Sequence, residues 1–143
     1  MDGTLERVRR GFAAQGFMRT LGAELEHVEA GECHIAVRFS DELTQQHGLF
    51  HGGVTATLAD NAAAGAGYSL MSTDEQPLTV EFKINFVAPA RGDGLVGKAR
   101  VLRNGRRLKV VESKVFARDG GTENLVAAAL ATIASTGSVD APA

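Results

Sequence analysis

Residues 51–70, HGGVTATLADNAAAGAGYSL, are rich in alanine and glycine and contain a single carboxylate, Asp60. The stretch from about 54 to 71 is too long for a typical strand, and its alanine content favours a helix. Gly65 and Gly67 lower the helix propensity, so they fit only if another element packs closely against that face. A charge is costly to bury, which means that Asp60 either lies at the surface or has a chemical role.

Alternating polar and apolar residues predict strands on both sides of this helix. Two strands precede it, at 23–29 and 32–39, and four follow it, at about 78–88, 95–103, 107–117 and 124–134. One face of the strand at 78–88 is shared by Val80, Phe82, Ile84 and Phe86. The Asn104-Gly105 pair indicates a hairpin between two of the later strands.

The order of these elements predicts an α+β fold. Residues 4–18 place apolar side chains at helical spacing, so we expect an N-terminal helix within 1–20. One antiparallel sheet has a face to bury, and the helix at 54–71 is the only large element that can cover it. We therefore expect the sheet to curl around that helix. No linker divides the chain, and we expect a single domain over 1–136 with a flexible tail over 137–143.

Composition argues against several classes of function. The chain has 143 residues, of which 44% are hydrophobic, 22% charged and 6% aromatic, with no Trp and a net charge of -2. A nucleic-acid partner would need a basic surface or a stacking platform, so we expect none. No apolar stretch reaches membrane-spanning length, and the start, MDGTLERVRRG, lacks a signal core, so we expect a cytoplasmic protein without a membrane partner. A lone Cys33 predicts no internal disulfide and no metal site.

The start of the central helix has the features of a carbonyl-binding site. A helix N-terminus presents unpaired N–H groups, and a glycine there lets a ligand approach, so the Gly52 N–H could hold an oxyanion. Asp60 in apolar surroundings would be a stronger base than in water and could activate water or attack a carbonyl. There are alternatives for both positions. Gly52 and Gly53 could merely allow a tight entry into the helix, and Asp60 could lie in solvent or bond to a neighbouring backbone group.

The spacing of Gly52 and Asp60 predicts a second chain. The two residues are eight positions apart, which is about 12 Å along a helix, so one carbonyl cannot easily reach both. Two such helices packed antiparallel about a two-fold axis would bring Gly52 of one chain near Asp60 of the other. We therefore expect a homodimer with two sites, each built from both chains.

These residues resemble a known family. The patterns HGG at 51–53, LxD at 58–60 and NFVAPARG at 85–92 are similar to the PaaI-like branch of the hotdog-fold acyl-CoA thioesterases, in the 4-hydroxybenzoyl-CoA thioesterase superfamily. The resemblance covers roughly 20–135 of the chain. It implies a hotdog fold, in which a curved antiparallel sheet wraps around a long central helix, and hydrolysis of an acyl-CoA to the free acid and CoA. It also implies no cofactor, since CoA is part of the substrate, and a homotetramer formed as a dimer of dimers.

By matched position, the resemblance implies roles for five residues. The Gly52 N–H would bind the oxyanion, and Asp60 of the partner chain would be the base or nucleophile. His51 would position the carbonyl or the start of the helix. Gln45 falls where the family has a polar amide, more often Asn. Thr79 matches a hydroxyl residue that orients water, although a routine strand threonine is the alternative.

Further residues are candidates for binding the substrate. A basic cluster around the predicted hairpin would suit the CoA phosphates, although hairpin tips are also charged for solubility alone. Its members are Arg103, Arg106, Arg107 and Lys109, with Arg91 as a weaker candidate. Gly53 and Asn61 are expected to contact the substrate near the helix. Tyr68 and Met71 either line the acyl pocket or pack in the core.

Two other functions belong to the same fold. Hydratases and dehydratases that act on acyl thioesters resemble one another in a catalytic His within Asn-Pro-x-His or His-Phe-Pro signatures, which this chain lacks. A non-catalytic acyl-CoA-binding protein is an alternative from a different class. The acyl group is open among phenylacetyl, hydroxybenzoyl and medium-chain aliphatic groups, since the small residues from Ala62 to Gly67 leave space for each.

Overall fold

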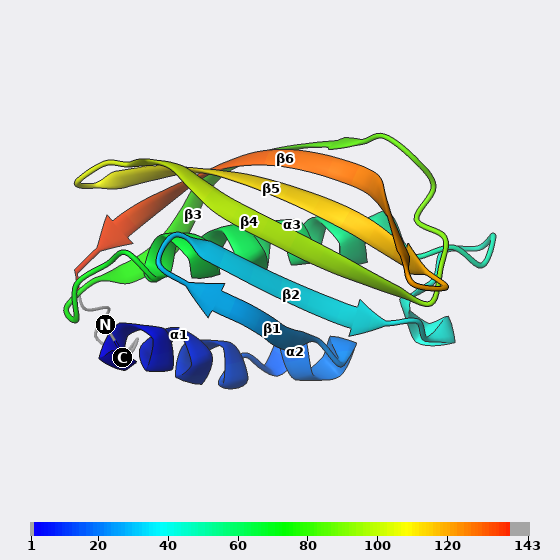
Figure 1. The fold of residues 1–143 in the computed structure, drawn as a ribbon, viewed down its shortest axis with the longest axis horizontal. Helices are drawn as coiled ribbons and strands as arrows, with labels where there is room; N and C mark the ends of the chain where they lie inside the picture. The colour runs from blue at the N-terminus through cyan, green and yellow to red at the C-terminus, as the bar shows by residue number, and fades with distance from the viewer. Residues whose placement is uncertain (1, 138–143) are drawn as a thin grey trace.

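The structure, a computed structural model, describes residues 2–137. Its six strands form one antiparallel sheet in the order β1-β2-β4-β5-β6-β3, with the long helix α3 on the inner face (Figure 1). The strands are β1 (Glu24–Glu29), β2 (Glu32–Arg38), β3 (Gln76–Phe86), β4 (Gly94–Asn104), β5 (Leu108–Asp119) and β6 (Thr122–Thr136). The helices are α1 (Asp2–Ala13), α2 (Gly16–Leu21) and α3 (Gly52–Tyr68), with a short 3-10 helix, η1 (Asp41–Leu43), before α3. The predicted α+β fold, with a sheet around a central helix, is confirmed.

The inner face of the sheet touches the backbone of α3 because both surfaces carry small residues. Four alanines of α3 are fully buried: Ala59, Ala62, Ala63 and Ala66. A Cβ on Gly97 of β4 would lie 2.8 Å from the Leu58 carbonyl oxygen, and one on Gly65 would lie 2.6 Å from Cys33 Sγ. Both distances are too short for real side chains, so the two glycines permit the close approach. The prediction that another element packs closely against the glycine-containing face of this helix is confirmed.

The N-terminal segment forms two helices, where the sequence predicted one within 1–20. Gln15 has an extended backbone (φ -80°, ψ 110°) that separates α1 from α2. The next residue, Gly16, has a low helix propensity, which favours the break. α2 ends at Leu21 and is capped by Gly22, whose φ of 71° lies in the left-handed region. α1 packs against β1 and α3, so the segment covers one side of the central helix.

A bulge in β3 corrects the predicted face of that strand. The pairing with β6 shifts between Thr79 and Glu81, so Val80 has no partner in the register and is 54% exposed. The other residues predicted for this face lie opposite alanines of β6: Phe82, Ile84 and Phe86. Because the bulge inserts one extra residue, Thr79 takes the inner position that the alternation assigned to Val80.

The remaining strands lie where the sequence predicts them, with small differences at their ends. The hairpin at Asn104-Gly105 is confirmed, and Gly105 lies so close to the Leu108 carbonyl oxygen that a Cβ would clash with it.

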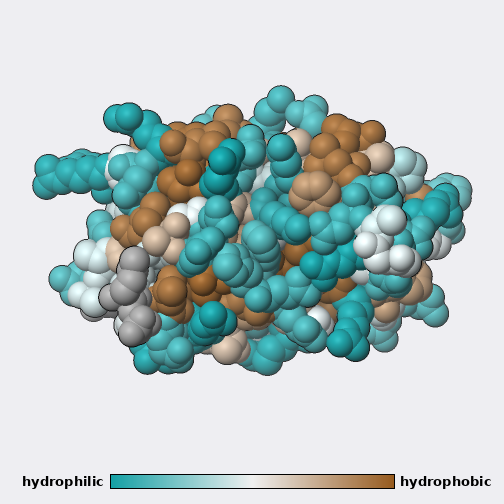
Figure 2. All heavy atoms as spheres, in the orientation of Figure 1, coloured by the Kyte–Doolittle hydropathy of each residue, from teal (hydrophilic) through white to brown (hydrophobic). Residues whose placement is uncertain are grey.

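From residue 138 onward, the predicted flexible tail lies outside the described residues. None of the helices within residues 2–137 is both long and apolar enough to cross a lipid bilayer. Figure 2 shows one face of the molecule, largely hydrophilic with several apolar patches.

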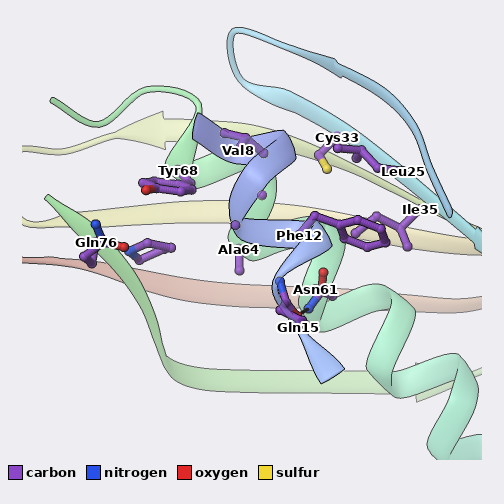
Figure 3. Close-up of a pocket in the computed structure, with 13 residues that line it drawn as sticks. Val8, Phe12, Gln15, Leu25, Cys33, Ile35, Asn61, Ala64, Tyr68 and Gln76 are labelled. Carbon is purple, nitrogen blue, oxygen red and sulfur yellow. Dashed lines mark hydrogen bonds between the residues drawn. The ribbon is translucent and has the colours of Figure 1, made fainter. Parts of the chain in front are cut away.

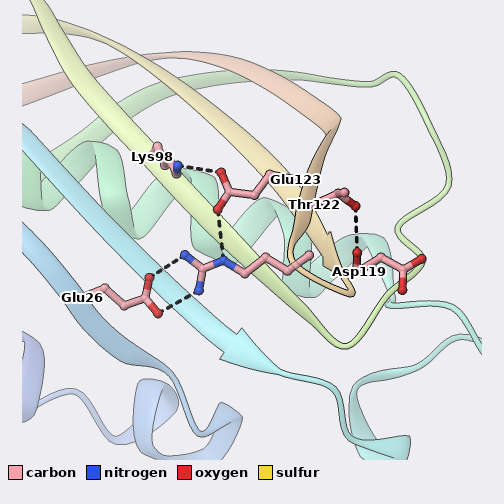
Figure 4. Close-up of polar contacts among 6 residues, drawn as sticks. Glu26, Lys98, Asp119, Thr122 and Glu123 are labelled. Atoms are coloured by element: carbon pink, nitrogen blue, oxygen red, sulfur yellow. Dashed lines mark hydrogen bonds and ion pairs between the residues drawn. The ribbon is translucent and has the colours of Figure 1, made fainter.

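A network of ion pairs ties β1 to the later strands (Figure 4). Arg118 of β5 donates hydrogen bonds to Glu26 of β1 at 2.7 and 2.8 Å, and to Glu123 of β6 at 3.1 Å. Lys98 of β4 donates to Glu123 at 2.7 Å. The hydrogen bonds from Arg118 hold the pKa of Glu26 below its ordinary value, and those from Lys98 and Arg118 do the same for Glu123.

We expect Arg118→Met to lower the free energy of unfolding by about 1 kcal/mol near neutral pH, because it removes charged hydrogen bonds at partly exposed sites. Each glutamate has a lower pKa in the folded than in the unfolded state. This stabilisation is therefore present above the ordinary glutamate pKa of 4.5 and is lost as the pH falls through the lowered values. Urea unfolding at about pH 7 and about pH 3 measures the difference. If Arg118→Met lowers the free energy of unfolding equally at both pH values, this explanation is wrong.

Candidate active site

The start of α3 is fixed by its capping residue. His51 has an extended backbone, and its Nδ1 accepts a hydrogen bond of 2.8 Å from the Gly53 N–H, as an N-cap residue does. Gly52 is the first residue of the helix, so its own N–H has no acceptor within the helix. A Cβ at Gly52 would lie 3.4 Å from Phe86 Cε1, so a larger side chain would press on that ring. The structure thus places His51 and Gly53 in the cap and leaves the Gly52 N–H available.

A hollow of about 190 Å³ lies beside Gly52, and we call it the Gly52 hollow. Its polar lining comes from Gln45, Gly52 and Thr55, and much of the rest is apolar, including Phe50, Phe86, Pro89 and Val126. The Gln45 Oε1 accepts hydrogen bonds from the backbone N–H groups of His47 (2.5 Å) and Leu49 (3.3 Å). Its NH2 group has no protein partner within residues 2–137. Gln45 and Gly52, both predicted for the site, therefore line the same space.

Asp60 lies two turns further along α3 and is half-buried. Its Oδ1 accepts a hydrogen bond of 2.7 Å from the Thr79 hydroxyl. Thr79 reaches the helix because the β3 bulge places it on the inner face of the sheet. The structure thus brings these two predicted residues together.

Asp60 lines a second hollow, of about 330 Å³, which we call the Asp60 hollow. Asn61 and Phe82 line it from α3 and β3, while Gln15 and Phe17 come from the N-terminal segment. Gly52 does not line this space, and Asp60 does not line the Gly52 hollow. Within this chain, the two central residues of the predicted site therefore line different spaces.

A cavity of about 220 Å³ lies between α1, α3 and the first two strands, and we call it the α1 cavity (Figure 3). Its walls are mainly apolar and include Val8, Phe12, Leu25, Ile35 and Ala64. Gln15 and Asn61 line both this cavity and the Asp60 hollow. They point toward one another in Figure 3, and Asn61 Nδ2 donates a hydrogen bond of 2.6 Å to Gln15 Oε1. This pair marks the boundary between the two spaces.

Tyr68 lines the α1 cavity and also belongs to the main hydrophobic core. The Arg7 guanidinium lies 4.7 Å from the centroid of the Tyr68 ring, a cation–π contact. Figure 3 shows Tyr68 and Gln76 at some distance from the Gln15–Asn61 pair. Met71, by contrast, is buried in the main hydrophobic core.

The predicted basic cluster is only partly available to a ligand. Its exposed members, Arg103, Arg106 and Arg107, form no ion pair within the described part of the chain, and neither does Arg91, the weaker candidate, which is also exposed. Lys109 is 3% exposed, and its ammonium group donates to the Gly105 carbonyl oxygen at 3.1 Å. It faces inward because β5 alternates, which corrects its place in the cluster.

Two further titratable features are the Cys33 thiol, which lines the α1 cavity, and a cluster on β1 and β2. Burial raises the pKa of the Cys33 thiol to about 12, so the residue is an inert, small core side chain, as predicted. His27 and Glu29 of β1 and Glu32 of β2 place possible ligand atoms within 4.8 Å of one another. These are exposed or half-buried side chains, and hydrogen bonding to His27 lowers the pKa of Glu29.

Sequence reasoning missed Gln15, Phe17 and Thr55. The first two belong to the α1–α2 segment, and no local pattern indicates that this segment reaches Asp60. Thr55 is three residues after Gly52, so helical spacing places both on one face and could have identified it.

Comparisons with known proteins point to one family. Residues 47–124 match the family model described as the thioesterase superfamily. A thioesterase family protein from Silicibacter pomeroyi has the same fold, with a TM-score of 0.90 and 37% identity over 92% of this chain and 97% of that one. Acyl-coenzyme A thioesterase 13 of Homo sapiens is 33% identical over 66% of this chain and 69% of its own length.

Two more distant proteins extend the likeness. The 1,4-dihydroxy-2-naphthoyl-CoA hydrolase of Listeria monocytogenes is 28% identical over 83% of this chain and 94% of its own length. The PaaI protein of Escherichia coli, from the phenylacetic acid degradation operon, is 19% identical, with a TM-score of 0.84 over 96% of each chain. At that identity the likeness to PaaI shows the shared fold alone.

Proposed function

The chain belongs to the thioesterase superfamily and is a thioester hydrolase, and we propose that it cleaves an acyl-CoA to the free acid and CoA. Two relatives are named for CoA thioesters, which supports this class of substrate. The observation that carries the proposal is the 2.7 Å hydrogen bond from Thr79 to Asp60. It orients a carboxylate on the same helix whose first residue, Gly52, has a free N–H.

The proposed chemistry uses hydrogen-bond donors on one side of the carbonyl and a carboxylate on the other. The Gly52 N–H and the Gln45 NH2 would donate to the carbonyl oxygen as it becomes an oxyanion. The Thr79 hydroxyl donates a hydrogen bond to Oδ1 of Asp60, so Oδ2 remains free for chemistry. Oδ2 could take a proton from an attacking water, or it could attack the carbonyl carbon itself. In either route the carbon–sulfur bond breaks and CoA leaves as a thiolate that takes up a proton. The second route forms an anhydride that water then hydrolyses.

A second protomer would bring these groups to one carbonyl. β3 is an edge strand with two outward apolar side chains that are more than half exposed, Leu78 and Val80, and Val87, the next residue after the strand, is exposed to the same degree. Such an edge favours pairing with another chain. Two β3 edges paired about a two-fold axis would continue the sheet and set the α3 helices antiparallel. Pairing of two such dimers would use further exposed leucines, Leu102, Leu108 and Leu130.

The α1 cavity is the proposed space for the acyl group. It adjoins the Asp60 hollow at the Gln15–Asn61 pair, and its apolar walls suit a hydrocarbon. A volume of about 220 Å³ favours a compact group, such as phenylacetyl or hydroxybenzoyl, over a long chain. Asn61 and Tyr68 would contact this group, and Gly53 would lie near the thioester end.

The exposed arginines of the β4–β5 hairpin, Arg103, Arg106 and Arg107, are proposed to bind the CoA phosphates. They carry no competing ion pair within residues 2–137, and guanidinium groups bind phosphate in a bidentate manner. Arg91, which is also exposed, is a second candidate for the same role.

We expect the wild type to release free thiol from benzoyl-CoA or phenylacetyl-CoA, and Asp60→Asn to lower kcat by about 10²-fold or more. The amide can neither take a proton from water nor attack the carbonyl. A colorimetric thiol assay measures both rates. Asp74→Asn, the same change at an exposed residue in the loop after α3, is the matched control and should keep the wild-type kcat.

Two outcomes of this assay would favour other functions. Loss of enoyl absorbance from crotonyl-CoA without thiol release would indicate a hydratase. Binding of acyl-CoA without thiol release, with equal affinity in Asp60→Asn, would indicate a non-catalytic binding protein.

Co-expression of Asp60→Asn with Gly52→Val should restore activity that neither variant has alone. Each mixed dimer holds one intact site and one site with both changes, so random pairing restores about one quarter of the wild-type thiol release. Asp60→Asn paired with the double variant Gly52→Val/Asp60→Asn should restore none. If purified mixed dimers stay inactive, the hypothesis that each site is built from both chains is wrong.

Ala64→Leu should shift the preference of the enzyme toward small acyl groups, because the added side chain fills the α1 cavity. We expect kcat/KM for phenylacetyl-CoA to fall about tenfold or more, while that for acetyl-CoA changes less than about twofold. Ala13→Leu adds the same volume at an exposed position of α1 and should leave both values unchanged. An equal fall for both substrates in Ala64→Leu would place the acyl group elsewhere.

A further inference from the structure

Thr55 carries a hydroxyl that no protein group satisfies. The residue lies in the first turn of α3 and is 1% exposed, and its Oγ1 has no hydrogen-bond partner within residues 2–137. Thr57, in the same helix, has the ordinary arrangement, in which Oγ1 donates to the Gly53 carbonyl oxygen at 2.7 Å. Valine has nearly the same shape as threonine and buries no polar atom. The Thr55 hydroxyl therefore destabilises the folded protein relative to valine.

The position of Thr55 connects this hydroxyl with the Gly52 hollow. Thr55 follows Gly52 by three residues on the same helix face, and both line the hollow together with Gln45. The Gly52 N–H and the Gln45 NH2 are donors without protein acceptors in the described chain. Apolar side chains surround these donors, so water would compete little with a bound group for their hydrogen bonds. Three residues that carry polar groups without protein partners thus line one hollow.

We propose that the Thr55 hydroxyl is a third hydrogen-bond donor to the carbonyl oxygen of the substrate. The proposal rests on the thioester hydrolysis proposed above and adds a catalytic residue to it. Threonine in a helix populates two χ1 rotamers, so rotation about the Cα–Cβ bond can turn Oγ1 into the hollow when the substrate enters.

The proposal also explains why a polar residue occupies this buried position. A thioester carbonyl oxygen gains negative charge as the carbon is attacked, and an additional donor then stabilises it more than in the ground state. The hydroxyl costs stability in the free protein and is satisfied when the oxyanion forms. Unsatisfied polar groups of this kind are found at functional sites, where the surrounding structure holds them.

Thr55→Val, with Ser113→Ala as matched control, separates catalysis from stability. Ser113 of β5 is also fully buried with an unpartnered Oγ, but it lines none of the hollows described above. We expect both variants to raise Tm by about 2–4 °C, because each removes an unsatisfied hydroxyl. Only Thr55→Val should lower kcat for benzoyl-CoA, by about 10²-fold, with KM within about twofold of wild type. Thr55→Ser, which keeps the hydroxyl, should retain most of the kcat.

Three results would overturn the proposal. The first is a wild-type kcat in Thr55→Val, and the second is a similar loss of kcat in Ser113→Ala, which would trace the effect to packing. The third is a loss of kcat in Thr55→Ser equal to that in Thr55→Val. Should Thr55→Val fail to fold, Thr55→Ala carries the same expectation for kcat. A wild-type protein that releases no thiol from any acyl-CoA would contradict the proposed function itself, so the two failures are distinguishable.

Discussion

No side chain fits between Gly97 of β4 and the Leu58 carbonyl of α3, or between Gly65 and Cys33. The sheet therefore lies directly on the helix backbone, and this contact sets how tightly the sheet curls. Alanine along the rest of α3 keeps the same spacing, so the helix is fixed over its full length. A helix held in this way gives its functional groups constant positions without the need for a rigid loop.

The same constraint explains the spread of the candidate site over separate hollows. A straight helix separates Gly52 from Asp60 by about 12 Å, and the surrounding sheet prevents the helix from bending to shorten that distance. The residues that contact the functional groups of α3 must then come from outside the helix. Thr79 reaches Asp60 from β3 and Gln15 reaches Asn61 from the N-terminal segment, while the exposed apolar edge of β3 favours contact with a second chain.

Sequence patterns predicted most of the fold because the signals are local. Alternation located the strands, alanine content located α3, and Asn104-Gly105 located a hairpin. The errors have two causes: a bulge that depends on the neighbouring strand, and a residue that was grouped by closeness in sequence and not by its place in the strand alternation. Val80 fits the alternation of its strand, yet the pairing with β6 forms a bulge there and exposes it. Lys109 follows the hairpin arginines in sequence, but the strand alternation turns its side chain inward.

What the sequence by itself determined is which groups can act and how far apart they stand. The spacing of Gly52 and Asp60 on one helix, and the unpaired N–H groups at its start, follow from helix geometry, which is the same wherever a helix forms. Only the tertiary structure decided which residues meet them. The contact of Thr79 with Asp60, the Gln15–Asn61 pair and the unsatisfied hydroxyl of Thr55 join or isolate groups through strand register and side-chain packing. Register and packing depend on residues far apart in the chain, so local spacing in the sequence cannot predict these contacts.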